Sequence, residues 1–386
     1  MWLAIAVALV AANLRPAVAS IGPVIDDVRD GLHLSSLSVS ILTSLPVVCF
    51  GALAPLGPWL TRRIGMARAV GVFCVLIAVG LVVRIGPDAA TMYGGTLIVA
   101  AGIAALNVLI PVLIKQDFPH RTGSMMGVYT LSLTGAAAVA AGLTVPVGDA
   151  IGHGWRGGLG VWAVLALVAI LFWVPQIRAA GEARVVTAAA SGLFRDRIAW
   201  LMTIYFGFQS LSFYAVLTWL PSVFEAHGVD ASHAGALLSV STAIQAPVAL
   251  ATPALAMRLH RQTSLVIGTV VFTGLGLLAV LLFPMGAPYV WVIVLGIGQG
   301  ASFPLVLTLM VLRTRTSDVT QQLSSMAQGV GYLIAAAGPL LAGILHSVSG
   351  HWTLPLAVLI ALLVPQGLAG YAVARPGFAG EPTRSR

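Results

Sequence analysis

The sequence predicts an all-α integral membrane protein with twelve transmembrane helices in two pseudo-symmetric halves of six. Three observations lead to this fold class. The 386 residues are 59% hydrophobic and only 8% charged, with a mean hydropathy of +0.98, and no soluble protein with a polar surface has such a composition. The apolar segments are long and continuous, as membrane helices require, and do not alternate as barrel strands do. The longest polar connection follows the sixth apolar segment.

Twelve apolar segments of membrane-spanning length follow one another along the chain. The first six cover residues 2–24, 36–57, 67–85, 91–114, 123–147 and 157–177. The other six cover residues 198–224, 231–256, 263–283, 287–312, 322–345 and 352–374. We therefore expect an N-terminal half over residues 1–177, a cytoplasmic linker over 178–197, a C-terminal half over 198–374 and a cytoplasmic tail over 375–386.

The distribution of Lys and Arg sets the expected orientation. Sixteen of the 20 basic residues lie in one set of connections and in the C-terminal tail, whereas the opposite loops hold only Arg29, Arg84 and Arg156. Because cytoplasmic loops are enriched in Lys and Arg, both termini are expected in the cytoplasm and the chain in the cytoplasmic membrane. The same bias explains the formal charge of +8. The basic residues form no patch interleaved with aromatic residues, so we expect no nucleic-acid partner.

The stretch Asn13-Leu14-Arg15-Pro16 interrupts the first apolar segment. Arg15 is the only ionisable residue between Trp2 and Val24, and in a membrane-spanning helix it would lie near the midplane. A guanidinium there costs about 2.5–3.5 kcal/mol and keeps its proton, so water, a partner or a ligand must stabilise it. Pro16 has no N–H for the carbonyl of Ala12, which loosens the helix. We expect Asn13 and Pro16 to form a helix break, and Arg15 to be the only ionisable side chain deep in the membrane.

Two roles remain open for Arg15. It can bind an anion or an electronegative ligand, or it can donate hydrogen bonds only to backbone carbonyls. An ion pair is not expected, because no Asp or Glu lies within another apolar segment. The donors of a guanidinium form a fixed fork that meets two acceptors at once, which favours planar or linear anions.

Polar side chains recur at helical spacing in several other spans. Such groups either line a cavity or hold helices together by hydrogen bonds. Asn107 and Gln299 occupy comparable positions, because Ala101-Gly102-Ile103 and Leu295-Gly296-Ile297 open similar stretches of the fourth and tenth spans. The candidate substrate-binding residues are Arg15, Asn107, Tyr129, Gln209, Gln299, Gln328, Tyr332, Tyr205 and Trp219.

Signatures of catalysis are missing from the sequence. No Cys/His cluster has metal spacing, no carboxylate pair lies at a common depth, and no Gly-x-Ser-x-Gly motif is present. We therefore expect no enzyme, no metal and no cofactor. The expected partners are membrane lipid and a small-molecule substrate, and the expected oligomeric state is a monomer. Since no span embeds an Asp, Glu or His, uniport, anion exchange or proton transport on the substrate is favoured over carboxylate-coupled symport.

Twelve spans in two halves, with a central cytoplasmic loop and cytoplasmic termini, resemble the major facilitator superfamily. The basic loop between its second and third spans appears here as Leu60-Thr61-Arg62-Arg63-Ile64-Gly65-Met66-Ala67-Arg68. When this loop is aligned on Gly65, Arg62 stands where the superfamily usually has an aspartate. The resemblance implies a gating role for Arg62 and Arg63, although without the usual aspartate.

Within the superfamily, the chain is similar to the branch of cyanate and 2-nitroimidazole transporters. The motifs that carry this likeness are Asn13-Leu14-Arg15-Pro16, Leu45-Pro46, Cys49-Phe50-Gly51, Lys115-Gln116-Asp117-Phe118-Pro119 and Trp219-Leu220-Pro221. With Arg15, the likeness implies a secondary transporter that moves a cyanate-like, nitrite-like or small carboxylate solute by alternating access. The alternatives are an exporter of neutral or anionic drug-like compounds such as nitroimidazoles, and a membrane sensor that transports nothing.

Overall fold

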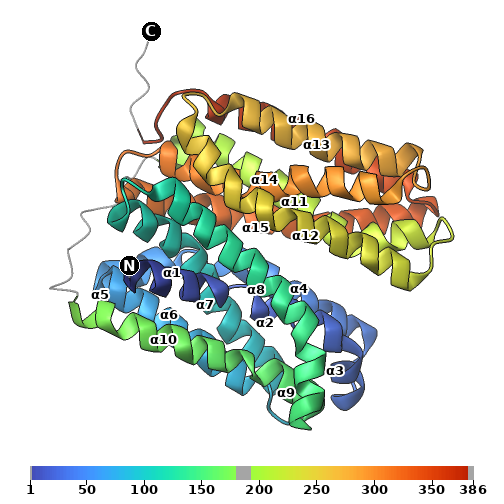
Figure 1. Ribbon diagram of the computed structural model, residues 1–386, viewed down its shortest axis with the longest axis horizontal. Coiled ribbons are helices and arrows are strands. Elements are labelled where there is room, and N and C mark those ends of the chain that lie inside the picture. The colour runs from blue at the N-terminus through green and yellow to red at the C-terminus, as the bar shows by residue number, and fades with distance from the viewer. Residues whose placement is uncertain (1, 180–192, 381–386) are drawn as a thin grey trace. The chain divides into compact units, whose positions relative to one another are not determined.

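A computed structural model describes residues 2–179 and 193–380 of the chain. Within these residues all regular structure is helical (Figure 1). Eleven of the described helices are long and apolar enough to cross a membrane, and the pair Ile41–Leu53 and Leu56–Ile64, bent by 50°, provides a twelfth span. The predicted all-helical membrane fold is therefore confirmed, whereas the cytoplasmic position of the termini stays a prediction.

The chain folds into two compact units. Unit 1 comprises Met1–His120 and Val128–Ala188, and unit 2 comprises Arg121–Gly127 and Ala189–Arg386. The expected half boundaries at residues 177 and 198 remain predictions. Most of the expected linker, residues 180–192, and the end of the expected tail, residues 381–386, lie outside the described residues.

Unit 1 is built around the contact between α6 (Met66–Val83) and α7 (Ala89–Asp117), with α10 (Trp162–Ala179) running along α6 (Figure 1). A Cβ on Gly80 would meet the backbone of α7 at Gly95, so this glycine allows the close approach of α6 and α7. The other helices here are α1 (Trp2–Ala12), α2 (Pro16–Ala19), η1 (Gly22–Val24), α3 (Ile25–Gly31), α4 (Ser36–Leu53), α5 (Leu56–Ile64), α8 (Thr122–Ile151), whose first turns belong to unit 2, and α9 (Gly154–Gly160).

Unit 2 has a central helix, α14 (Pro288–Leu312), packed between α12 (Ala231–Arg258) and α13 (Thr263–Leu282). Gly296 and Gly300 face the backbone of α12, whereas Gly298 faces Thr273 of α13, so the glycines of this stretch serve close helix packing. The remaining elements are η2 (Leu193–Arg195), α11 (Arg197–Glu225), α15 (Ser317–Ser349) and α16 (Thr353–Ala374).

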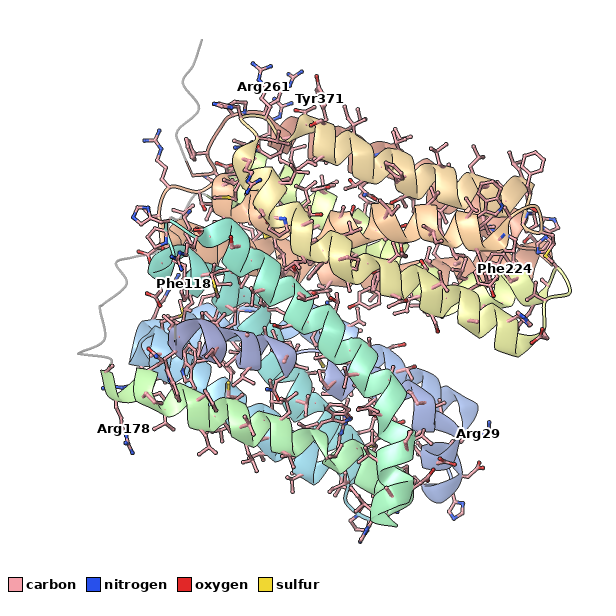
Figure 2. The ribbon with its side chains drawn as sticks, in the orientation of Figure 1. Arg29, Phe118, Arg178, Phe224, Arg261 and Tyr371 are labelled. Atoms are coloured by element: carbon pink, nitrogen blue, oxygen red, sulfur yellow. The ribbon has the colours of Figure 1, made fainter. Side chains whose placement is uncertain are left out.

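Charged side chains lie mainly at the ends of the helices. Arg178 extends outward at the end of α10 and Arg29 at the end of α3 (Figure 2). Water or lipid headgroups can solvate these charges, whereas the lipid tails cannot.

One prediction about the end of a span was wrong. The expected loop at Arg62 and Arg63 is helical, because α5 continues to Ile64 and only Gly65 separates it from α6. Gly65 makes this tight turn possible with φ = 84°, a region that other residues rarely adopt. Arg84 lies in the connection between α6 and α7, as expected, but its side chain is fully buried in the protein, which the sequence did not indicate.

Candidate functional site

The first predicted span is divided into short helices at the motif that contains Arg15. Helix α1 ends at Ala12 and α2 begins at Pro16. In between, the N–H groups of Asn13 and Leu14 donate to carbonyls only three residues back, at 3.1 Å each. Pro16 occupies the first position of α2, where a missing N–H leaves no hydrogen bond unmade. Arg15 is therefore the residue that precedes a new helix, and its carbonyl accepts the first hydrogen bonds of that helix.

Two of the candidate residues meet in the interior of unit 1, and Arg15 lies within electrostatic range of one of them. The hydroxyl of Tyr129, on α8, donates a hydrogen bond to the Oδ1 atom of Asn107, on α7, at 3.4 Å. Tyr129 is fully buried and Asn107 is 2% exposed, while Arg15 is half-buried. The positive charge of Arg15 lies within electrostatic range of the Tyr129 hydroxyl. The guanidinium, the phenol and the amide together supply several hydrogen-bond donors in one apolar interior.

Asn13 has a separate function from this cluster. Its Nδ2 atom donates to the carbonyl of Leu9 at 2.8 Å and to the carbonyl of Leu165, on α10, at 3.3 Å. The first of these carbonyls belongs to the last complete turn of α1. Asn13 therefore joins the end of α1 to α10, a structural role that holds one side of the helix break in place.

The candidates of unit 2 are buried on three of its helices. Gln209, on α11, donates to the hydroxyl of its neighbour Ser210. Gln328, on α15, donates to the hydroxyl of Ser324 at 2.7 Å. Gln299 of α14 is 6% exposed, and Tyr332 of α15 is 1% exposed with its ring edge-on to that of Phe206, 5.0 Å between centroids. These contacts lie inside unit 2, and the role of the four residues in binding stays a prediction.

Tyr205 and Trp219 make contacts that fit a structural role. The Tyr205 hydroxyl lies near the hydroxyls of Thr269 on α13 and Ser302 on α14. Trp219 donates from its indole nitrogen to the carbonyl of Pro339, on α15, at 2.9 Å. The Trp219 bond thus joins α11 to α15, which was the alternative reading of the polar stripes, and the Tyr205 hydroxyl lies where α11 is close to α13 and α14.

Arg84 is the residue that the sequence reasoning missed. It directly follows α6, is 0% exposed, and donates from its guanidinium to the carbonyl of Ala17 and, at 3.1 Å, to the hydroxyl of Ser20. These acceptors lie in and immediately after α2, the short helix that Arg15 precedes. The only signal in the sequence was an arginine at the end of an apolar run, which positive loops at span ends also produce.

Unit 2 holds a comparable buried arginine in another place. Arg313, after the end of α14, is 8% exposed and donates to the carbonyls of Val373 and Ala374 at 2.7 and 2.8 Å. It also donates to the Oε1 atom of Gln262 at 2.6 Å. Arg313 therefore joins the ends of α14 and α16 and does not contact α11, the first span of its unit, through any of these bonds.

Known proteins similar to this chain are transporters. An uncharacterized transporter of Bacillus subtilis, YycB, is 37% identical over 100% of this chain and 96% of its own. The 2-nitroimidazole transporter of Escherichia coli is 33% identical over 93% of both chains. The cyanate transport protein CynX of Escherichia coli is 31% identical over 89% of this chain and 90% of its own.

A solved structure and a protein family that match this chain are also those of transporters. The crystal structure of the major facilitator superfamily transporter FucP in its outward conformation superimposes with a TM-score of 0.77 over 97% of this chain and 100% of FucP, at 11% identity. Residues 1–339 match the Major Facilitator Superfamily. The chain is a multi-pass membrane transporter and not an enzyme, and it belongs to the major facilitator superfamily.

Proposed function

We propose that this transporter moves a small anion or a small electronegative solute across the cytoplasmic membrane by alternating access, and that Arg15 binds this substrate. The observation that carries the proposal is the cluster of Arg15 with Tyr129 and Asn107 in the interior of unit 1. A half-buried positive charge within electrostatic range of a buried phenol, which itself bonds an amide, is suited to a ligand that accepts hydrogen bonds.

The chemistry of the cluster favours a planar or linear anion. A guanidinium donates two parallel hydrogen bonds to one ligand, and charge-assisted bonds of this kind are about twice as strong as neutral ones. Arg15 lies in the break between α1 and α2, where the backbone does not form a regular helical turn. Gln209, Gln299, Gln328 and Tyr332 of unit 2 remain candidates for further contacts with the substrate.

The relatives support the same class of solute. Cyanate is a linear anion, and 2-nitroimidazole carries a planar nitro group whose oxygens accept hydrogen bonds. The proteins named for these two solutes align with nearly the whole of this chain. The second candidate function, export of neutral or anionic drug-like compounds such as nitroimidazoles, has its support in the 33% identity with the 2-nitroimidazole transporter. A cationic solute fits neither proposal, because Arg15 would repel it.

Ligand-induced thermal stabilisation of the purified protein tests the proposal. The ligands are cyanate, nitrite, nitrate, bicarbonate, small carboxylates and 2-nitroimidazole, applied to wild type, Arg15→Gln and the control variant Arg178→Gln, which removes an exposed arginine at the end of α10. A ligand at 100 times its Kd stabilises the native state by about 2.7 kcal/mol.

The outcomes separate the two candidate functions. We expect one anion to stabilise wild type and Arg178→Gln but not Arg15→Gln. If only 2-nitroimidazole stabilises the protein, and does so equally in Arg15→Gln, the exporter function is favoured and Arg15 has a structural role. Binding in every variant without flux in sealed vesicles would identify a sensor.

A further inference from the structure

The broken first span needs a second attachment besides Asn13. The N–H of Ile21 donates to the carbonyl of Val18 at 3.3 Å, a bond three residues back, so it does not serve the carbonyl of Ala17 as a regular α-helical bond would. The last carbonyls of a helix need partners from outside, and Arg84 supplies one for Ala17. Its second terminal nitrogen bonds the hydroxyl of Ser20 just beyond the helix.

Close packing of α7 against the backbone of Arg84 allows the side chain to reach α2. Gly95, on α7, packs against the backbone of Arg84, and a Cβ on Gly95 would overlap that backbone. Arg84 is fully buried, which is costly for a charge unless hydrogen bonds compensate. The chain thus retains a buried charge where Arg84 contacts α2. Arg15 directly precedes this helix.

We propose that Arg84 is a positioning residue, which holds α2 in the orientation that directs the Arg15 guanidinium at the substrate. This inference rests on the proposed function, since it treats Arg15 as the substrate-binding charge. With only four residues, α2 is too short to hold its own orientation. Asn13 fixes the chain before Arg15 and Arg84 fixes the chain after it, so the guanidinium is carried by a segment anchored on both sides.

The test compares Arg84→Met, which removes the donors and the buried charge, with Arg84→Lys, which keeps the charge but has no planar fork. Arg313→Met is the matched control, because Arg313 is also buried and bound to backbone carbonyls, but those carbonyls belong to the end of α16 in unit 2. Ser20→Ala removes a single acceptor of Arg84 and serves as a milder variant if Arg84→Met fails to fold.

The first measurement needs no ligand. Hydrogen exchange of the amides in residues 16–24, followed by mass spectrometry, should accelerate in Arg84→Met and less in Arg84→Lys. Arg313→Met should leave this segment as protected as in wild type. Unchanged protection of residues 16–24 in both Arg84→Met and Ser20→Ala would overturn the proposal.

The second measurement is the Kd of cyanate, with 2-nitroimidazole as a parallel probe. Arg84→Met should weaken binding on the order of ten- to a hundredfold, as loss of groups that orient a binding residue generally does. In an Arg15→Gln background the same change should have no further effect, because the two residues act as one unit. Equal losses with and without Arg15 would contradict a positioning role. If Arg15→Gln alone leaves the Kd of both probes unchanged, the proposed function fails, whereas the exchange experiment still decides whether Arg84 holds α2.

Discussion

The first spans of the two units are built in opposite ways. In unit 2, α11 is one continuous helix of 29 residues with no charged residue between Arg197 and Glu225. In unit 1, the segment from Trp2 to Gly31 is divided into α1, α2, η1 and α3, with Arg15 at the first break. Both segments contain proline, but Pro221 lies in the last turns of α11, whereas Pro16 falls in the middle of an apolar run.

Packing explains why each form is stable. Helix α11 contacts α15 closely, because Gly207, Gly331 and Gly338 each leave room for a side chain or backbone of the other helix. The broken span of unit 1 is held by polar bonds at defined points, from Asn13 to α10 and from Arg84 to α2. A continuous helix satisfies its own backbone, whereas a broken one depends on donors from neighbouring elements. This dependence is what allows a charged residue to be placed at the break.

The largest effect is expected from removing the charge at the break. Arg15→Gln loses two charge-assisted bonds to the substrate, so we expect cyanate uptake into proteoliposomes at subsaturating concentration to fall on the order of a hundredfold or more. Gln209→Ala on the continuous α11 is the comparison, and it should reduce uptake much less because no charge is removed. An Arg15→Gln variant that folds and transports normally would refute the site.

A smaller effect is expected when the charge is kept but its shape is changed. Arg15→Lys retains the positive charge and loses the planar fork, so one of two parallel bonds to a linear anion is missing. The affinity for cyanate, measured by calorimetry, should fall about tenfold. Affinity equal to that of wild type would mean that Arg15 acts as a point charge only.

Making the broken span more like the continuous α11 should stabilise the protein and slow its transport. Pro16→Ala supplies an N–H for the carbonyl of Ala12 and favours a continuous helix, which we expect to raise the stability by about 1 kcal/mol. Turnover of cyanate should decrease several-fold if the break moves during transport. Pro221→Ala, at the end of α11, serves as the control and should leave turnover unchanged. Equal or faster turnover in Pro16→Ala would count against a hinge at this position.

The smallest effect concerns the helix start beside Arg84. The Asp88 carboxylate accepts the N–H of Thr91 at 2.8 Å at the start of α7, whereas Ala287 at the start of α14 has no side-chain cap. This hydrogen bond lowers the pKa of Asp88 below its ordinary value. Its contribution is therefore present above the ordinary pKa of an aspartate and is lost as the pH falls through the lowered value.

The cap is tested by its pH dependence. Asp88→Ala should lower the Tm by a few degrees at most at pH 7, and the difference from wild type should disappear in strongly acidic buffer. A difference that persists unchanged at acidic pH would show that the carboxylate charge is not its source. The control is Ala287→Asp, which should add a cap to α14 and raise the Tm slightly.

Hydropathy alone predicted most of the fold. Long apolar runs must be helical in lipid because every backbone group needs an internal partner, so the spans and their number could be read from composition and length. The break at Arg15-Pro16 could be predicted for the same kind of reason, since proline removes a backbone donor wherever it stands. The continuation of α5 to Ile64 could not be predicted, because the charged Arg62 and Arg63 mark the end of an apolar run and not the end of a helix.

The sequence by itself determined that a helix break with an arginine would lie inside the membrane protein, because that requires only local chemistry. The tertiary structure alone decided what surrounds it. Tyr129 and Asn107 are 22 residues apart and meet only because α8 brings its side chain to α7 at this point. Arg84 lies 64 residues from Ser20, and its burial depends on the space that Gly95 leaves on α7. Contacts between helices depend on which faces pack together, and the hydropathy of a single helix does not specify its neighbours.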